Sequence, residues 1–276
     1  MGVAARRTVA DLVVRRVPEL PDVEGYRRVL RGARGRTIRS VTVRDAGVLR
    51  GVSAAGLERG LRGRRFREPY RHGKWLLAPT DGEQVLAFHF GMTGALVLSR
   101  SDEPPHPYDR VVLALGDDLE LRYRDQRKLK GLRLEDRASA RRLVARLGPD
   151  AADLTRQDLT AVLEHRRARI KAVLLDQSAV AGLGNLLADE ILWRARVHPA
   201  RRASDLTSAE GDRVLAGTRR VLRTAVRDGR VPPRRSWLTG RRDRVHPDCP
   251  RCATPLRHRA VAGRSTYWCP HCQPEP

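Results

Sequence analysis

The sequence predicts an α+β protein of several domains, with an N-terminal β-sandwich and flanking helices followed by a helical domain and a zinc ribbon. Short β-rich segments separated by Gly, Pro and Asp turns follow one another between residues 37 and 123, and this spacing is typical of a sandwich or barrel. From about residue 134 the apolar residues recur with a helical period. All four cysteines lie in the last 28 residues, where they predict a metal-binding ribbon.

Residues 1–17 predict an extension, because two Arg pairs flank a short apolar stretch before Pro18 starts a different pattern. Asp22 can cap a helix that runs to about Arg31. The strands expected after this helix share β-branched and apolar residues bounded by turn residues. They cover 37–44, 75–78, 84–90, 95–98, 111–115 and 120–123.

Helical periodicity and capping residues predict five helices in the second half of the chain. They cover 137–147, 155–165, 170–175, 184–195 and 208–227. The elements divide the chain into an extension, a β-sandwich domain, a helical domain and a zinc ribbon. The expected boundaries of these four parts are 1–17, 18–134, 135–230 and 231–276.

The chain is strongly basic, with 55 Lys and Arg against 32 Asp and Glu and a formal net charge of +23. This excess argues against a basic partner and favours a polyanion, most often nucleic acid. Only four of the basic residues are lysines, and so strong a preference for Arg can also reflect the base composition of a genome. The hydrophobic fraction of 41% is enough to form a core, and no run of 18 apolar residues predicts a membrane span.

The cysteines form a C-x2-C pair, sixteen intervening residues and a second C-x2-C pair, made of Cys249, Cys252, Cys269 and Cys272. Two such pairs can present four thiolates to one structural Zn²⁺ in a tetrahedron. The alternative is two disulfides, which need an oxidising compartment. The N-terminal residues do not form a secretory signal, so we expect zinc.

Four further motifs are weak when each is taken alone. Residues 18–24, PELPDVE, form a turn before a helix, and Lys74 at a strand start is an ordinary solvated lysine. Met92, on a loop between glycines, can fill a gap in the core. The glycines in 181–185 precede a helix and would let the backbone approach a phosphate, but the G-x-G-x-x-G spacing of a dinucleotide site is absent.

Taken together, the motifs resemble the formamidopyrimidine-DNA glycosylase / endonuclease VIII family of bifunctional DNA glycosylase/AP lyases. The resemblance runs in family order from Pro18 to Cys272. Its blocks are PELPDVE at 18–24, RHGKWLL at 71–77, HFGMTG at 89–94, LRYRDQRKLKG at 121–131, LLDQSAVAGLGNLLADEILWRARVHP at 174–199 and GRSTYWCPHC at 263–272. The resemblance implies that the helical domain is a helix–two-turn–helix domain and that the sandwich domain is catalytic.

The resemblance implies a covalent mechanism in which an N-terminal proline amine attacks the sugar C1′ of a damaged nucleotide. Pro18 matches this nucleophile, and Glu19 matches the acid that protonates the ring oxygen and moves protons. Asp22 matches a second carboxylate that is usually Glu, although helix capping also accounts for it. Lys74 matches a lysine of the catalytic site that contacts the phosphates near the lesion.

The family also has residues that hold the DNA backbone and residues that fill the stack when a base flips out. Asn185 and Arg264 match the phosphate contacts, which position the duplex without reading its sequence. Met92 and Arg127 match two of the residues that fill the gap, with Arg127 facing the orphaned base. Leu129 stands where the third is usually Phe, so an aromatic stacking surface is lost.

In the printed sequence Pro18 is internal, and an amide nitrogen is not a nucleophile. Val17 stands where an initiator Met would precede the proline. We expect translation to start at Val17, from a GTG codon, with removal of that residue. The alternatives are trimming after synthesis or an inactive paralogue that retains residues 1–17.

The expected function is therefore base-excision repair of oxidised bases, with formamidopyrimidine-type purines favoured, followed by β/δ elimination at the abasic site. The expected partner is damaged double-stranded DNA, bound by a monomer with no role for a membrane, in the cytoplasm of a bacterium at the nucleoid. Residues 228–242 look short and Arg-rich for a loop over 8-oxoguanine. Endonuclease VIII-like activity on oxidised pyrimidines or abasic sites, or damaged-DNA binding without catalysis, are the alternatives.

Overall fold

The structure is a computed structural model that describes residues 17–164 and 166–275. Apart from Val17, the expected extension 1–17 lies outside the described residues. The chain forms two compact units, which we call the sandwich unit and the helical unit. Among the described residues, the sandwich unit comprises 17–18, Tyr26–Arg71 and Trp75–Ala140. The helical unit comprises Glu19–Gly25, His72–Lys74 and the described residues from Arg141 onward.

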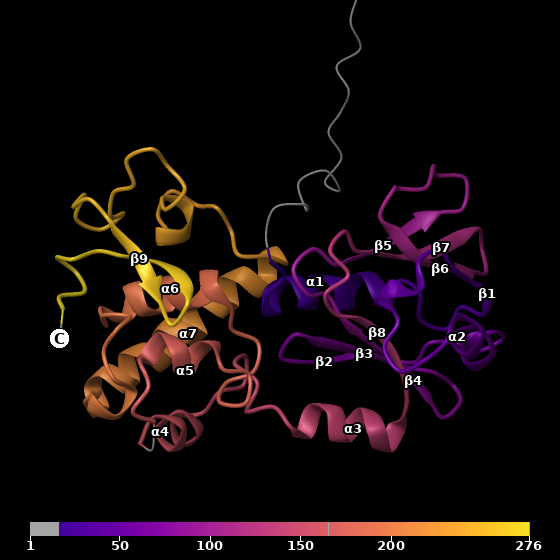
Figure 1. Cartoon of the computed structure of the whole chain (residues 1–276), viewed down its shortest axis with the longest axis horizontal. Helices are drawn as coiled ribbons and strands as arrows, with labels where there is room; N and C mark the ends of the chain where they lie inside the picture. Colours follow the sequence, from indigo (N-terminus) through magenta and orange to yellow (C-terminus); the bar gives the residue numbers. More distant parts are fainter. Residues whose placement is uncertain (1–16, 165, 276) are drawn as a thin grey trace, which may run out of the picture. The chain divides into compact units, whose positions relative to one another are not determined.

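The sandwich unit contains two four-stranded sheets, which confirms the expected β-sandwich (Figure 1). The order in one sheet is β1 (Ile38–Val43), β6 (Asp109–Leu115), β7 (Leu119–Arg124) and β5 (Ala95–Arg100). The order in the other is β2 (Tyr70–His72), β3 (Trp75–Pro79), β4 (Gln84–His89) and β8 (Gly131–Asp136). Both sheets contribute fully buried apolar side chains such as Leu76, Phe88, Leu113 and Leu121, as the inner faces of a sandwich do.

Sequence patterns do not predict β2, β8 or the helix α2 (Ala54–Leu61). Half of the residues in β8 are charged, namely Arg133, Glu135 and Asp136. The strand still pairs along the whole of β4, from Gln84 opposite Asp136 to His89 opposite Gly131. Pairing with a neighbouring strand, and not local preference, makes this segment a strand. The strand also crosses the domain boundary expected at residue 134.

The helix α1 (Leu20–Arg31) begins three residues before the start expected after an Asp22 cap. Asp22 is therefore its third residue and not its N-cap. The Asp22 carboxylate accepts a hydrogen bond from the backbone N–H of Glu19 at 2.9 Å. This is the reach-back half of a capping box, in which a third-position acid satisfies the N–H of the capping residue.

The helical unit confirms the other expected helices, with ends that differ by one or two residues. They are α4 (Arg156–Glu164), α5 (Ile170–Leu175), α6 (Asn185–Ala195) and α7 (Ser208–Asp228), while α3 (Arg137–Ala145) connects the units. Short 3-10 turns cover η2 (Ala46–Val48), η3 (Ala203–Asp205) and η4 (Leu238–Gly240). From Leu187 to Ala195, every residue of α6 except Arg194 is buried, so α6 is the central helix of this unit.

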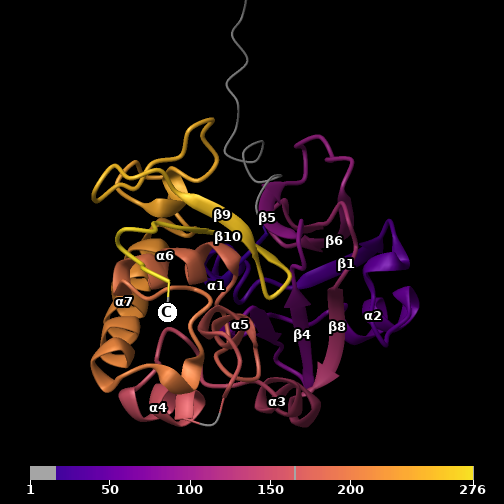
Figure 2. The same cartoon turned by 60° about the vertical axis from the view of Figure 1, so that its left-hand side comes forward.

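The C-terminal hairpin consists of β9 (Arg257–Val261) and β10 (Arg264–Trp268), paired antiparallel from Arg264 opposite Val261. β10 lies against α6 (Figure 2). Within the described residues, no helix is long and apolar enough to cross a membrane.

Candidate functional site

The Glu19 carboxylate lies on the first turn of α6. It accepts hydrogen bonds from the backbone N–H groups of Gly184 at 2.9 Å, Leu186 at 2.8 Å and Leu187 at 3.1 Å. These donors are free because the first N–H groups of a helix have no partner within it, and the helix dipole favours an acid there. Glu19 is only 1% exposed. Pro18, immediately before it, is also buried.

Glycine at position 184 makes this contact possible. A Cβ atom at Gly184 would lie 2.3 Å from Cδ of Glu19, far inside van der Waals contact. Gly182 has φ of +108°, a conformation that other residues rarely adopt, and its carbonyl accepts the N–H of Leu20 at 3.1 Å. The glycines that the sequence analysis expected to approach a phosphate therefore make room for the Glu19 side chain.

Burial raises the pKa of Glu19 above its ordinary value, although the charge of Lys74 and the three N–H donors oppose the shift. Burial likewise lowers the pKa of Lys74; Arg264 adds to the shift, whereas Glu19 and Asp22 oppose it. Two acids and two bases expected from the sequence thus influence one another within the helical unit. A buried acid with a raised pKa and a lysine with a lowered pKa in the same site are suited to proton transfer.

Lys74 lies on the turn that joins β2 to β3. The Gly73 N–H donates to Oδ2 of Asp150 at 2.7 Å, and the His72 Nε2 lies 3.0 Å from the carbonyl of Gly148. Gly73 has φ of +56°, so glycine suits the turn. Sequence reasoning did not single out Asp150, because its partner is 77 residues away.

The expected phosphate contacts Asn185 and Arg264 lie on adjacent elements of the helical unit. Asn185 is the first residue of α6, and its Nδ2 donates to the carbonyl of Ser265 at 3.0 Å. Arg264 is exposed and is the first residue of β10. The structure therefore brings the Asn185 amide against the residue that follows Arg264, although the two are far apart in the sequence.

A buried ion-pair network holds this hairpin to the helices, and sequence reasoning missed it. Lys171 of α5 is fully buried and donates to Asp189 Oδ1 at 2.6 Å, Thr266 Oγ1 at 2.7 Å and the Ser265 carbonyl at 3.2 Å. The other Asp189 oxygen accepts from Arg242 Nη1 at 2.8 Å. The sequence did contain one signal for this network. Lys171 is one of only four lysines in the chain, and it lies within the apolar segment IKAVLL.

The three residues expected to fill the base stack lie on two loops of the sandwich unit. The Arg127 Nη1 lies 3.0 Å from the Met92 sulfur, and Leu129 is half exposed at 50%. Asp125, which sequence reasoning did not single out, joins the loops. Its Oδ1 accepts from Thr93 Oγ1 at 2.6 Å and from the Arg127 N–H at 3.1 Å.

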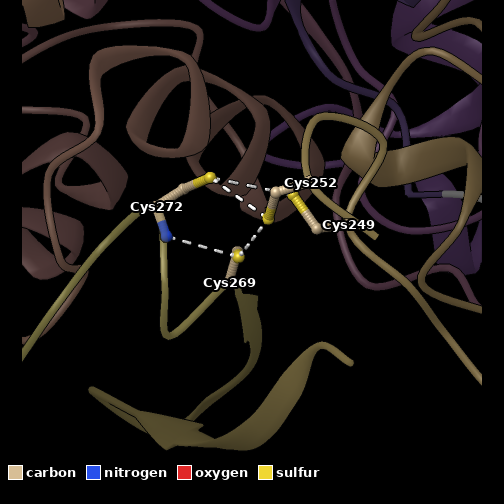
Figure 3. A group of neighbouring side chains, drawn as sticks. All are labelled: Cys249, Cys252, Cys269 and Cys272. Carbon is tan, nitrogen blue, oxygen red and sulfur yellow. Dashed lines mark hydrogen bonds between the residues drawn. The ribbon is translucent and has the colours of Figure 1, made fainter. Parts of the chain in front are cut away.

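The four cysteines converge in the ribbon (Figure 3). Their sulfur atoms all lie within 4.8 Å of one another. Cys252 Sγ is 3.5 Å from Cys269 Sγ and 3.6 Å from Cys272 Sγ, and Cys249 Sγ is 4.0 Å from Cys272 Sγ. A Zn–S bond of about 2.3 Å requires sulfurs roughly 3.8 Å apart in a tetrahedron. The geometry fits one structural Zn²⁺, and all four residues are free cysteines.

Three family models match the chain in succession. They are described as the formamidopyrimidine-DNA glycosylase N-terminal domain, over residues 17–132, the formamidopyrimidine-DNA glycosylase H2TH domain, over 147–233, and a zinc finger found in FPG and IleRS, over 249–274.

Curated relatives match nearly the whole chain. The formamidopyrimidine-DNA glycosylase of Symbiobacterium thermophilum is 40% identical, covering 94% of this chain and 90% of its own. That of Heliobacterium modesticaldum is 38% identical, covering 93% of this chain and 100% of its own.

Solved structures with similar folds contain DNA. The Lactococcus lactis FPG (MutM) bound to Fapy-dG DNA has a TM-score of 0.84 at 27% identity, covering 93% of this chain and 100% of its own. A MutM structure in complex with carbocyclic 8-oxo-G DNA has a TM-score of 0.85 at 27% identity, covering 94% and 100%.

Replacing one zinc ligand should release the metal and unfold the ribbon. We expect one Zn²⁺ per chain by elemental analysis, and none in Cys269→Ser, because metal binding supplies much of the folding energy of small zinc domains. Ellman titration after denaturation without reductant checks the alternative. If the purified chain contained two disulfides and no zinc, the assignment would be wrong.

Lys171→Met should lower the free energy of unfolding by about 3–5 kcal/mol, because it leaves Asp189 buried without one of its two cations. Urea titration followed by circular dichroism measures this. Lys130→Met is the matched control, since Lys130 is exposed and its replacement should change stability by less than about 0.5 kcal/mol. Equal effects of the two substitutions would contradict a structural role for the buried network.

Proposed function

The chain belongs to the formamidopyrimidine-DNA glycosylase family, and on that premise we propose that it excises oxidised purines of the formamidopyrimidine and 8-oxoguanine type from duplex DNA. It is a DNA glycosylase and an AP lyase, so it also cuts the strand at the abasic sugar. The observation that carries the proposal is the buried Glu19 carboxylate on the first turn of α6, directly after Pro18. Relatives of this family bind Fapy-dG DNA and carbocyclic 8-oxo-G DNA.

Pro18 is the nucleophile of the proposed mechanism. Its secondary amine attacks the sugar C1′ and the bond from C1′ to the damaged base breaks. Opening of the bond between C1′ and the ring oxygen then gives an iminium, in which the sugar is joined covalently to the proline. The cation acidifies the neighbouring C–H bond, so successive eliminations release the phosphates on both sides. An N-terminal amine has a pKa of about 8, so a useful fraction is unprotonated at neutral pH.

The mechanism requires a free amine at Pro18, so the active chain starts there. The family model begins matching at residue 17, and the full length of the Heliobacterium modesticaldum relative matches 93% of this chain. Both observations support a chain whose functional part excludes residues 1–16, and removal of Val17 would then leave Pro18 at the N-terminus. We assign 18–136 as the catalytic domain, which moves the expected boundary at 134 to the end of β8. We assign 137–230 as the helix–two-turn–helix domain and 231–276 as the zinc ribbon.

Glu19 is the general acid that protonates the opening sugar ring. Its burial raises its pKa, which favours the protonated form more than in an ordinary Glu. Lys74, Asn185 and Arg264 contact the phosphates around the lesion, and Lys171 positions the hairpin that carries Arg264. These cationic and amide donors hold the backbone without reading sequence.

Met92, Arg127 and Leu129 occupy the space that a flipped nucleotide leaves in the stack. Flipping costs a few kcal/mol, and an inserted side chain offsets part of this cost. Leu129 supplies apolar contact but no aromatic face, so it stabilises the extruded state less than the usual Phe would.

The enzyme acts as a monomer on DNA, in the cytoplasm at the nucleoid.

Borohydride trapping on duplexes that contain Fapy-dG, 8-oxoguanine or an abasic site tests the nucleophile. A chain that begins at Pro18 should form a covalent adduct, whereas Pro18→Gly and a chain that retains residues 1–17 should not. Gel electrophoresis detects the adduct. Adducts formed equally by all three proteins would place the nucleophile elsewhere, with Lys74 the first amine to replace; no adduct from any of them would indicate a protein that binds DNA without catalysis.

Glu19→Gln should reduce single-turnover base excision by about 10²–10⁴ while retaining strand cleavage at a preformed abasic site, which has no base to expel. In the unaltered enzyme, excision should fall as pH rises through the raised pKa of Glu19, because the acid then loses its proton. In the unfolded chain Glu19 has its ordinary pKa and loses this proton at lower pH. The free energy of unfolding should therefore decrease as pH rises from the ordinary pKa of Glu to the raised pKa of Glu19.

A pH profile of single-turnover excision measures this fall in rate. The fall should be absent in Glu19→Gln, which has no carboxyl proton to lose. If the substitution left excision unchanged, the carboxyl would have only a structural role on α6.

A further inference from the structure

The outer face of α7 carries a row of arginines that the proposed catalytic machinery does not use. Between residues 213 and 227 the helix contains five Arg and no Asp or Glu. The five are Arg213, Arg219, Arg220, Arg223 and Arg227, and all are exposed. The opposite face packs into the core through residues such as Val214, Thr218, Val221 and Ala225. At 100° per residue the arginines share one side of the helix, and we call this surface the arginine row.

The middle of the arginine row lacks acidic partners. Arg219 donates to the carbonyl of Leu154, and the side chains of Arg220 and Arg223 have no acidic partner in the described part of the chain. At the two ends of the row, Arg213 Nη2 lies 3.9 Å from Glu210 Oε1 and Arg227 Nε lies 3.6 Å from Asp228 Oδ1. Asp228 also binds Arg234, at 2.6 Å. The charges of Arg219, Arg220 and Arg223 are therefore not neutralised by any acid among the described residues.

This arrangement opposes helix stability. Arg219 with Arg223, Arg220 with Arg223, and Arg223 with Arg227 are like charges three or four residues apart, and such pairs repel across a helix surface. The helix dipole favours cations only in the last turn, so it accounts for Arg227 but not for Arg219, Arg220 or Arg223. A polyanion bound to the row would relieve the repulsion.

The row is separate from the phosphate contacts at Asn185 and Arg264. In both views α6 lies between the β9–β10 hairpin and α7 (Figures 1 and 2). β10 packs on α6, and α7 packs on α6 and α4. A duplex held by Asn185 and Arg264 therefore leaves the arginine row available to another ligand.

We propose that the arginine row binds a second, undamaged stretch of duplex DNA through its phosphates. From Arg213 to Arg227 the row is about 21 Å long at 1.5 Å per residue, which spans roughly six phosphates of one strand at 3.4 Å. Duplex is favoured over single strands because α7 has no aromatic residue on which bases could stack. A membrane is disfavoured because the apolar face of α7 is buried in the core.

Such a contact lets the protein hold two duplex segments and pass between them while searching for lesions. This inference rests on the proposed function, because it takes DNA as the polyanion.

A ternary binding experiment tests the inference with the chain that begins at Pro18. The lesion site is first saturated with an unlabelled duplex that contains a tetrahydrofuran abasic analogue, and binding of a fluorescent undamaged duplex is then followed by anisotropy at several salt concentrations. Arg220→Gln/Arg223→Gln should weaken this second binding by about fivefold or more and reduce the slope of log K against log salt by about 1.8. Single-turnover excision and borohydride trapping should not change.

The matched control is Arg59→Gln/Arg62→Gln. These arginines are also exposed and lie at the end of α2 in the sandwich unit. Their replacement removes the same charge as the α7 substitutions. The control should leave second-duplex binding within about twofold. The melting temperature of the α7 variant should equal that of the unaltered chain or exceed it by up to about 2 °C, because repulsion is removed.

Equal loss in the α7 variant and the control would overturn the inference, since net charge alone would then explain the binding. Tighter binding of single-stranded DNA or of RNA than of duplex would overturn duplex as the ligand. If the α7 variant lost excision and trapping as well, the row would belong to the lesion site. Normal trapping without any second-duplex binding would refute this inference alone, whereas failure to trap any lesion would refute the proposed function.

Discussion

The contact on which the proposed active site depends is the Glu19 carboxylate on the first turn of α6. A buried carboxyl group is stable only where hydrogen bonds replace its hydration, and the start of a helix offers unpaired N–H groups. Gly184 leaves the space for the side chain to reach them. One residue thereby joins positions 165 to 168 apart in the sequence. The residue after Pro18 is held by the helical unit, and its acid–base properties follow from that burial.

The hairpin that presents Arg264 depends on a different kind of interaction. Lys171 and Asp189 are both buried, and an ion pair in that setting contributes little net stability compared with apolar residues of equal size. Its directional hydrogen bonds do specify geometry, because Lys171 contacts both Ser265 and Thr266 on β10. The network therefore explains how a small zinc ribbon can keep the strand that begins at Arg264, the proposed phosphate contact, beside Asn185.

The basic charge of the chain divides into parts with different physical roles. Some arginines are structural: Arg122 is almost fully buried and donates to the carbonyls of Arg100, Glu103 and Pro104. Others form surface ion pairs, which contribute little to stability. The arginine row on α7 is different, because its central charges have no acidic partner among the described residues and repel one another. The net charge does not distinguish these roles. The contacts of each guanidinium group show which role each arginine has.

The sequence by itself determined what depends on short spacing. The C-x2-C pairs predict the zinc ligands, helical periodicity predicts α4 to α7, and six motif blocks indicate the family. Tertiary structure alone decided what depends on distant neighbours. β8 is a strand because β4 pairs with it, Asp125 matters because it joins two loops, and Lys171 contacts residues 18 to 95 positions away. Periodicity reports which face of an element is buried, but it carries no information about which buried charge meets which partner.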